Sequence, residues 1–187
     1  ADPILVRARR MLLETEAGGH LLAQEPFIET TTRYTTSSCG YTELGLPTYM
    51  AAMLDSLART PVQGAEGPEG RTVLFPTFYG HQEQAFRAFL ARGRDIVVAT
   101  GTGSGKTECF LVPMLGSLFA EARERPASFA MPSVRALILY PMNALVNDQL
   151  ARLRLLFGDP SVASAFRGTA AKRFPRFGMY TGRTSYP

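Results

Sequence analysis

Residues 100–107 read TGTGSGKT and combine the residue types that a phosphate-binding loop requires. Its three glycines let consecutive backbone N–H groups turn toward one anion, and a helix starting after the loop adds its positive end. Lys106 is placed to pair with the outer phosphates and the Thr107 hydroxyl to ligate Mg²⁺, so these are the predicted catalytic residues. The predicted nucleotide-binding residues of this segment are Thr100, Gly101, Thr102, Gly103, Ser104, Gly105, Lys106, Thr107 and Glu108.

Residues 78–85, FYGHQEQA, hold a second candidate group upstream of the loop. The side-chain amide of Gln82 offers one donor and one acceptor, which match N6 and N7 of adenine. The alternative is that Gln82 caps a helix and that His81 has a core or capping role. The residues alone leave both roles of Gln82 open.

Residues 137–149, LILYPMNALVNDQ, place a strand ending directly before a helix start. Pro141 frees the end of the strand, Asn143 can cap the helix, and the exposed helix N-terminus can receive a phosphate. An ordinary strand-to-helix turn with an asparagine cap explains the same letters. The predicted nucleic-acid contacts here are Pro141, Asn143 and Ala144.

Residues 179–187, MYTGRTSYP, offer a last candidate group. The hydroxyl of Thr181, the small Gly182 and the guanidinium of Arg183 are suited to phosphate contacts. A surface turn accounts for these residues equally well.

Local patterns predict the elements that must position these groups. Short apolar runs at 94–100, 134–140 and 176–182 are expected to be buried parallel strands. Apolar residues recur at helical spacing in five further segments, and Gly93 is a natural stop for one of them. These helices are expected at 4–17, 48–59, 81–92, 106–124 and 143–157. Helices alternating with strands predict an α/β fold with a parallel sheet.

The segment TPVQGAEGPEG, with two prolines and three glycines, predicts a linker at 61–70. It divides the expected architecture in two. Residues 1–70 are predicted to form a helical and irregular accessory region, and residues 71–187 the nucleotide-binding domain. The chain does not start with Met and its last residues show no helix stop, so we expect a piece of a longer protein.

Charge is unevenly distributed along the chain. Residues 151–187 contain seven Lys and Arg against Asp159 alone, which is +6, whereas the whole chain is +4. This balance favours a polyanionic partner. Cys39 and Cys109 match no metal spacing and no apolar run is long enough for a membrane span, so we expect reduced thiols in a cytoplasmic protein.

These three motifs, in this order, resemble the first half of the first motor domain of superfamily 2 DEAD/DEAH-type helicases. Thr100 stands where the general loop pattern has glycine, which is typical of that superfamily. The resemblance implies a RecA-like fold in which Gln82 reads the adenine edge and an aromatic residue, best matched by Tyr79, stacks on the base. It also implies that residues 141–144 bind the backbone of a nucleic acid. ILYPMNALVNDQLARLRLLFGDP and YTGRTSYP are most similar to large bacterial anti-phage helicases of the Druantia and DISARM kind.

The resemblance also exposes a gap, because no Asp-Glu pair of the D-E-x-x type follows the loop and no arginine finger is present. Without that pair nothing in the chain polarises the attacking water or completes the Mg²⁺ site. The predicted function is therefore the ATP-binding part of an ATP-dependent DNA helicase. The 187 residues by themselves are expected not to hydrolyse ATP at a useful rate. A translocase that does not unwind, and a non-catalytic nucleotide-gated binding module, stay as alternatives. The expected partners are DNA more than RNA, the rest of the helicase chain and other defence subunits.

Overall fold

The computed structural model describes residues 2–14, 33–62, 72–140, 143–182 and 184. They fall into two compact units, residues 1–33 and 34–187. The first unit contains helix α1 (Pro3–Glu14), which confirms the helix predicted from residue 4; residues 15–17 of that prediction lie outside the described residues. Apolar side chains of α1, Ile4, Leu5 and Met11 among them, are exposed.

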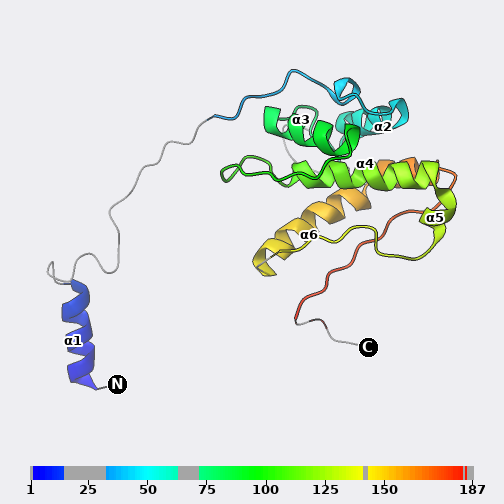
Figure 1. Cartoon of the computed structure of the whole chain (residues 1–187). Coiled ribbons are helices and arrows are strands. Elements are labelled where there is room, and N and C mark those ends of the chain that lie inside the picture. The colour runs from blue at the N-terminus through cyan, green and yellow to red at the C-terminus, as the bar shows by residue number, and fades with distance from the viewer. Residues whose placement is uncertain (1, 15–32, 63–71, 141–142, 183, 185–187) are drawn as a thin grey trace. The chain divides into compact units, whose positions relative to one another are not determined.

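The second unit is built from helices around one core, as Figure 1 shows. The helices predicted at 48–59, 106–124 and 143–157 are confirmed, and the one predicted from His81 begins one residue earlier and ends in a π-helical turn. Gly93 adopts φ +61° just after that turn, as expected for a stop. The elements are η2 (Tyr41–Glu43), α2 (Thr48–Arg59), α3 (Gly80–Phe86), η3 (Arg87–Ala91), α4 (Glu108–Glu124), α5 (Pro126–Ala130), α6 (Asn143–Gly158) and α7 (Pro160–Arg167).

Helix α4 is the centre of this unit, and it contacts α2, α3, η3 and α5. Its buried face includes Leu111, Val112 and Leu115, each 1% exposed or less. Leu54 of α2 and Phe166 of α7, both fully buried, complete the same core. Burying side chains of this size stabilises the fold by about 1.5–3 kcal/mol each. The core therefore holds α4 in place, and with it the N-terminus of this helix, which follows the loop.

Residues 34–37 form a strap that lies along the segment before α3. The backbone N–H of Ser37 donates to the Phe78 carbonyl at 2.8 Å, and that of Gly80 donates to the Thr35 carbonyl at 2.9 Å. Thr36 and Tyr79 pair in an isolated antiparallel bridge between these bonds. The strap therefore brings a segment about forty residues distant in sequence to the start of α3.

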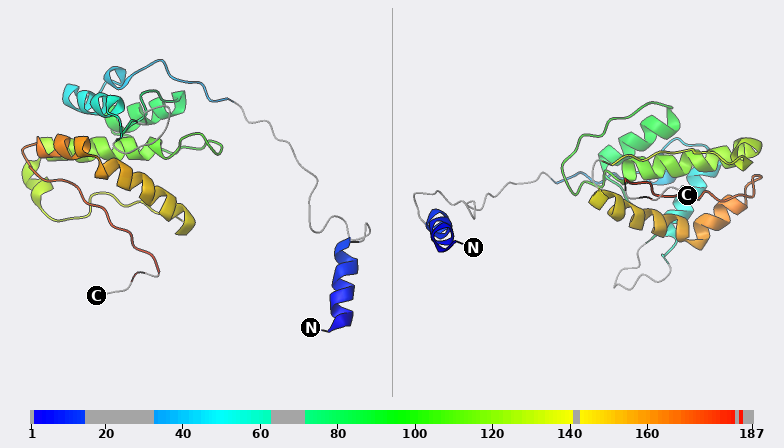
Figure 2. Two further views of the ribbon diagram at one scale, coloured as in Figure 1. Left: turned by 180° about the vertical axis from the view of Figure 1, so that it is seen from behind. Right: turned by 90° about the horizontal axis from the view of Figure 1, so that it is seen from below.

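The predicted parallel sheet is not confirmed, because the described parts of 94–100, 134–140 and 176–182 contain no strand. Figure 2 shows them as tubes without strand arrows: 94–100 and 134–140 connect helices, and 176–182 leads from α7 toward the C-terminal end. Val97 is 96% exposed, and Val134 and Leu139 are 84% and 80% exposed. An apolar strand is buried only when neighbouring strands and helices cover it, and the described residues supply no such ladder.

Of the predicted linker, only residues 61 and 62 are described; residues 63–70 lie outside the described part. Pro61 forms an isolated antiparallel bridge with Thr72 across this gap. Residues before the gap pack into the core of the second unit, since Met50, Leu54 and Leu57 of α2 share one cluster with Val112 of α4.

Candidate nucleotide site

The loop that precedes α4 depends on glycine at two positions. Gly103 and Gly105 have φ of +71° and +72°, the left-handed region that side chains with a Cβ rarely adopt. A Cβ at Gly105 would lie 2.5 Å from Nε2 of Gln82, and one at Gly101 would lie 2.8 Å from the Tyr34 hydroxyl. The backbone therefore has the turn and the close approach expected of a phosphate cradle.

Lys106 lies across the loop in this structure. Its ammonium donates to the Thr100 carbonyl at 2.7 Å and also to the Gly101 carbonyl. The hydroxyls of Thr100 and Ser104 are 2.7 Å apart and hydrogen-bonded, and Ser104 is buried. Thr100, which replaces the usual glycine, thus braces the loop internally, and the ammonium of Lys106 is held by two carbonyls of the same loop. Pairing of Lys106 with an outer phosphate stays a prediction.

Thr107 and Glu108 start the helix that leaves the loop. Thr107 has helical backbone angles and its carbonyl accepts from the N–H of Leu111 at 3.0 Å. Its hydroxyl is the predicted Mg²⁺ ligand. No cluster of three or more His, Cys, Asp and Glu that could hold a metal occurs among the residues with described placement. Glu108, predicted as a nucleotide-binding residue, is 7% exposed and pairs with Arg152.

Gln82 connects the loop to α3. Its Oε1 accepts from the Tyr79 N–H at 2.7 Å, and its Nε2 donates to the Gly105 carbonyl at 2.8 Å. The first contact is a helix cap, which is the alternative that the sequence left open. The second joins Gln82 to the phosphate loop. Recognition of adenine by the remaining donor and acceptor positions of this amide stays a prediction.

Three aromatic rings gather beside the loop. Tyr79 lies 5.7 Å from His81 in a stacked arrangement, and Tyr34 lies 5.6 Å from Tyr79 and 5.3 Å from His81. His81 also contacts the Ser104 carbonyl through Nε2 at 2.9 Å. The sequence prediction found Tyr79 but not Tyr34, whose place depends on the strap and has no local signal.

Cys109 follows Glu108 and is a free thiol with 1% exposure. Burial, reinforced by the neighbouring Glu108 carboxylate, raises the pKa of its thiol to about 11. The thiol therefore stays protonated at neutral pH and packs as a small apolar side chain.

The predicted nucleic-acid contacts are only partly described. Pro141 and Arg183 lie outside the described residues; Asn143 and Ala144 form the first turn of α6, but the placement of their side chains is not described. The N–H of Thr181 donates to the Thr184 hydroxyl at 2.9 Å, and the Thr184 N–H donates to the Thr181 carbonyl. These two hydrogen bonds join Thr181 to Thr184 as in a surface turn, which is the alternative stated for these residues; phosphate contact by Thr181 and Gly182 stays a prediction.

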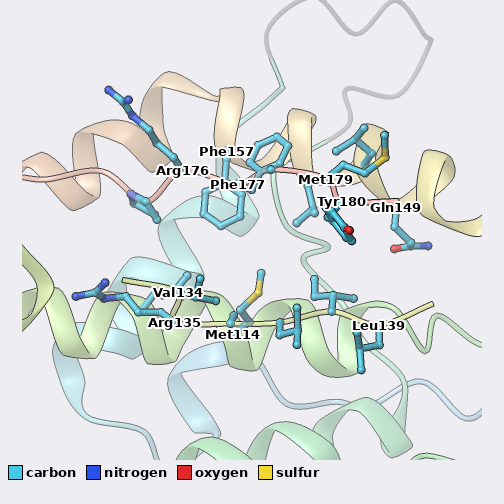
Figure 3. Close-up of a pocket in the computed structure, with 18 of the residues that line it drawn as sticks. Met114, Val134, Arg135, Leu139, Gln149, Phe157, Arg176, Phe177, Met179 and Tyr180 are labelled. Carbon is cyan, nitrogen blue, oxygen red and sulfur yellow. The ribbon is translucent and has the colours of Figure 1, made fainter. Parts of the chain in front are cut away.

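A cavity of about 910 Å³ lies away from the loop, between the extended segments 132–140 and 173–182. Figure 3 shows Leu139 and Val134 along one side and Phe177, Met179 and Tyr180 along the other. Residues 100–108 are not among those that line it. Two of the segments that the sequence predicts as strands therefore line it together with residues of α4, α5 and α6, and it is distinct from the loop at 100–107.

The family match covers the segment that contains Gln82 and the loop at 100–107. The DEAD/DEAH box helicase family matches residues 79–176, just over half of the chain. Druantia protein DruE of Escherichia coli is 44% identical over the whole chain, which covers 9% of that protein. The uncharacterized ATP-dependent helicase YprA of Bacillus subtilis is 33% identical over 45% of the chain and 10% of its own length.

A further relative, ATP-dependent RNA helicase ROK1 of Scheffersomyces stipitis, is 34% identical over 34% of the chain and 11% of its own length. The chain thus spans about a tenth of the length of these relatives. No solved structure matches, and no described helix is long and apolar enough to cross a membrane. With the phosphate loop, the bridging glutamine and the family match in agreement, the chain belongs to the DEAD/DEAH box helicase family.

Proposed function

We propose that this chain forms the ATP-binding part of an ATP-dependent DNA helicase that acts in bacterial anti-phage defence. The observation that carries the proposal is the contact of Gln82 with Gly105. It joins the predicted base-reading side chain to a phosphate loop whose glycines have the required positive φ. The similarity to Druantia protein DruE over all 187 residues supports the defence role.

In this proposal each residue of the loop has a defined task. The backbone N–H groups of 101–105 and the N-terminus of α4 hold the phosphates, and Lys106 exchanges its two carbonyl partners for phosphate oxygens. Thr107 would hold Mg²⁺ in part, and that ion would supply positive charge against the phosphates. Tyr79 stacks on the base while Gln82 reads its edge.

Lys106→Ala in the full-length protein tests the loop. ATP-dependent activity should be lost, because the charge that stabilises the transferred phosphoryl group is removed. The midpoint of thermal unfolding should change little, since the Lys106 side chain is only partly buried and contacts loop carbonyls. Continued ATP hydrolysis by this variant would refute the assignment of the loop.

Gln82→Ala tests base recognition, and Gln84→Ala is the matched control because it removes an exposed glutamine from the same helix. The Gln82 variant should lose preference for ATP over other nucleoside triphosphates, whereas the control should keep it. Lower stability with unchanged preference would leave Gln82 as a cap alone.

The alternatives differ in what they require. A translocase would consume ATP on DNA without separating strands, so strand-displacement and translocation assays on the same preparation distinguish it. A nucleotide-gated binding module would bind ATP and DNA without hydrolysis.

We also propose that the 187 residues alone bind nucleotide but do not hydrolyse it, because the chain lacks an Asp-Glu pair after the loop. Robust turnover by the isolated chain would overturn this.

A further inference from the structure

A partly buried ion pair connects the helix that leaves the loop at 100–107 to helix α6. Nε of Arg152 donates to Oε1 of Glu108 at 3.1 Å, with side chains 20% and 9% exposed. Glu108 is the first residue of α4 and follows Thr107 directly. Arg152 belongs to α6, which begins at Asn143 in the predicted nucleic-acid segment. The pair therefore joins the two elements that start at the two predicted binding segments.

The guanidinium of Arg152 holds a third segment as well. Its two terminal nitrogens donate to the Val73 carbonyl at 3.3 and 3.2 Å, and its central carbon lies 5.7 Å from the centre of the Phe75 ring. The Tyr41 hydroxyl donates to the Phe75 carbonyl at 3.1 Å. This planar fork with several donors is a geometry that lysine does not reproduce.

Among the described residues, the Glu108 carboxylate has few hydrogen-bonding partners other than Arg152. Its second carboxylate oxygen, Oε2, is buried and makes no hydrogen bond to any residue that the structure describes. A buried charge with incomplete partners is costly, so its position follows the partner that it has. The surroundings are dry enough that burial, together with the Glu108 charge, raises the pKa of Tyr41 far above its ordinary value. A shift of α6 must therefore either carry Glu108 along or break this ion pair.

We propose that the Glu108–Arg152 pair couples nucleic-acid binding at the start of α6 to the phosphate loop. Arg152 is a positioning residue that acts through Glu108 on the adjoining Lys106 and Thr107. It lies about 13 Å along the helix axis from Asn143, at 1.5 Å per residue, and a helix of this length moves as a stiff body. This inference rests on the proposed function, because it assigns a connection between the two sites named there.

Two variants of the full-length protein test the coupling. Arg152→Lys keeps the charge but loses the fork, and the double variant Glu108→Gln/Arg152→Gln removes both charges so that no unpaired charge is buried. For Arg152→Lys we expect nucleotide affinity without DNA, DNA affinity without nucleotide and the unstimulated rate of ATP hydrolysis to stay within about threefold. For the double variant, which also changes Glu108, only its own values with and without DNA are compared. Stimulation of hydrolysis by saturating single-stranded DNA should fall at least about fivefold, the lower end of typical couplings.

A second readout does not depend on hydrolysis. The affinity for a fluorescent, non-hydrolysable ATP analogue is measured with and without the same DNA, since coupling between two sites is reciprocal. DNA should change this affinity in the wild type and not in the double variant. Circular dichroism melting reports separately on folding.

The pair Glu121–Arg135 provides a matched control. It also joins α4 to another segment, at 3.2 Å, with side chains 16% and 15% exposed, but it lies near the far end of α4 from the loop. Glu121→Gln/Arg135→Gln should leave the stimulation by DNA intact. Equal loss in both double variants, or unchanged stimulation in the Glu108/Arg152 variants, would overturn the coupling. A wild-type protein that neither hydrolyses ATP nor binds it would instead refute the proposed function.

Discussion

At the scale of single residues, the site depends on how closely side chains approach the loop backbone. Gly105 shows this best, because two separate constraints meet there. Its φ of +72° disfavours any residue with a Cβ, and the Gln82 amide fills the space that a Cβ would need. Gly103 has nearly the same φ of +71° but open space around it. The two glycines thus allow backbone strain and side-chain clash to be measured separately.

Gly103→Ala is expected to cost about 1–2 kcal/mol of folding stability from backbone strain alone. Gly105→Ala should cost more and should also weaken nucleotide binding, because the Gln82 contact with the loop must break. Thermal unfolding and titration with a fluorescent ATP analogue measure both effects. Gly105→Ala/Gln82→Ala should be more stable than the sum of the single effects predicts, since the clash is removed. Strict additivity would show that Gln82 does not approach Gly105.

Cys109 gives a prediction about pH dependence. A raised pKa means that the thiolate fraction is small at pH 8 and grows only as the pH approaches about 11. With 1% exposure as well, the native thiol should resist iodoacetamide at pH 8, whereas the half-buried Cys39 should be modified. Peptide mass spectrometry after timed labelling measures both sites in one sample. Rapid native labelling of Cys109 at pH 8 would contradict its burial.

At the scale of elements, the strap is fixed to α3 by side chains as well as backbone. The Ser37 hydroxyl donates to Glu83 at 2.6 Å, and Arg87 donates to the other oxygen of the same carboxylate at 2.7 Å. These two hydrogen bonds hold the pKa of Glu83 below its ordinary value. The ionised carboxylate therefore stabilises the strap, and through it the position of Tyr34.

Because the folded-state pKa of Glu83 is lowered, its stabilising effect is present above the ordinary carboxyl pKa and disappears as pH falls through the folded value. Glu83→Gln should lower the midpoint of thermal unfolding at pH 7. The difference from wild type should shrink in acid below about pH 4. Asp55→Asn is a control, because its partner Arg59 is 78% exposed and such pairs contribute little. A difference for Glu83→Gln that persists unchanged in acid would contradict the ionic role.

Local signals predicted α2, α4 and α6 because apolar spacing acts within a few residues, as the exact agreement for α2 shows. The loop was predictable for the same reason, since its glycines and Lys106 are contiguous. The shorter helices α5 and α7 were not predicted, because five and eight residues give too short an apolar pattern. Arg152 and Tyr34 were missed because Glu108 lies 44 residues from Arg152 and Tyr79 lies on a different element from the strap. The strands were not confirmed because pairing depends on partners distant in sequence, which an apolar run alone does not specify.

At the scale of the whole molecule, the second unit combines a well-packed helical core with apolar segments that face solvent. Leu115 of α4 is fully buried, whereas Leu139 and Val134 are 80% and 84% exposed. Exposed apolar chain without strand partners favours self-association. A lysine placed in the core should therefore change the free energy of unfolding far more than a lysine placed in an extended segment.

Leu139→Lys should change the free energy of unfolding of this chain by no more than about 0.5 kcal/mol, as for other surface substitutions. It should also reduce binding of the dye ANS and association at micromolar concentration, measured by fluorescence and light scattering. Leu115→Lys is the contrasting variant, and it should prevent folding, because lysine would enter the core without a partner. A loss of several kcal/mol in Leu139→Lys would mean that this segment is buried in a sheet in solution.

The strap has a consequence for spectroscopy. The chain contains seven tyrosines and no tryptophan, so it has no indole emission of its own. Tyr34 lies within 5.6 Å of Tyr79, beside the loop, and is only partly buried. Tyr34→Trp would therefore place the chain's one indole at the candidate nucleotide site, and its emission, excited selectively over the remaining tyrosines, would report occupancy of the loop without any label on the nucleotide.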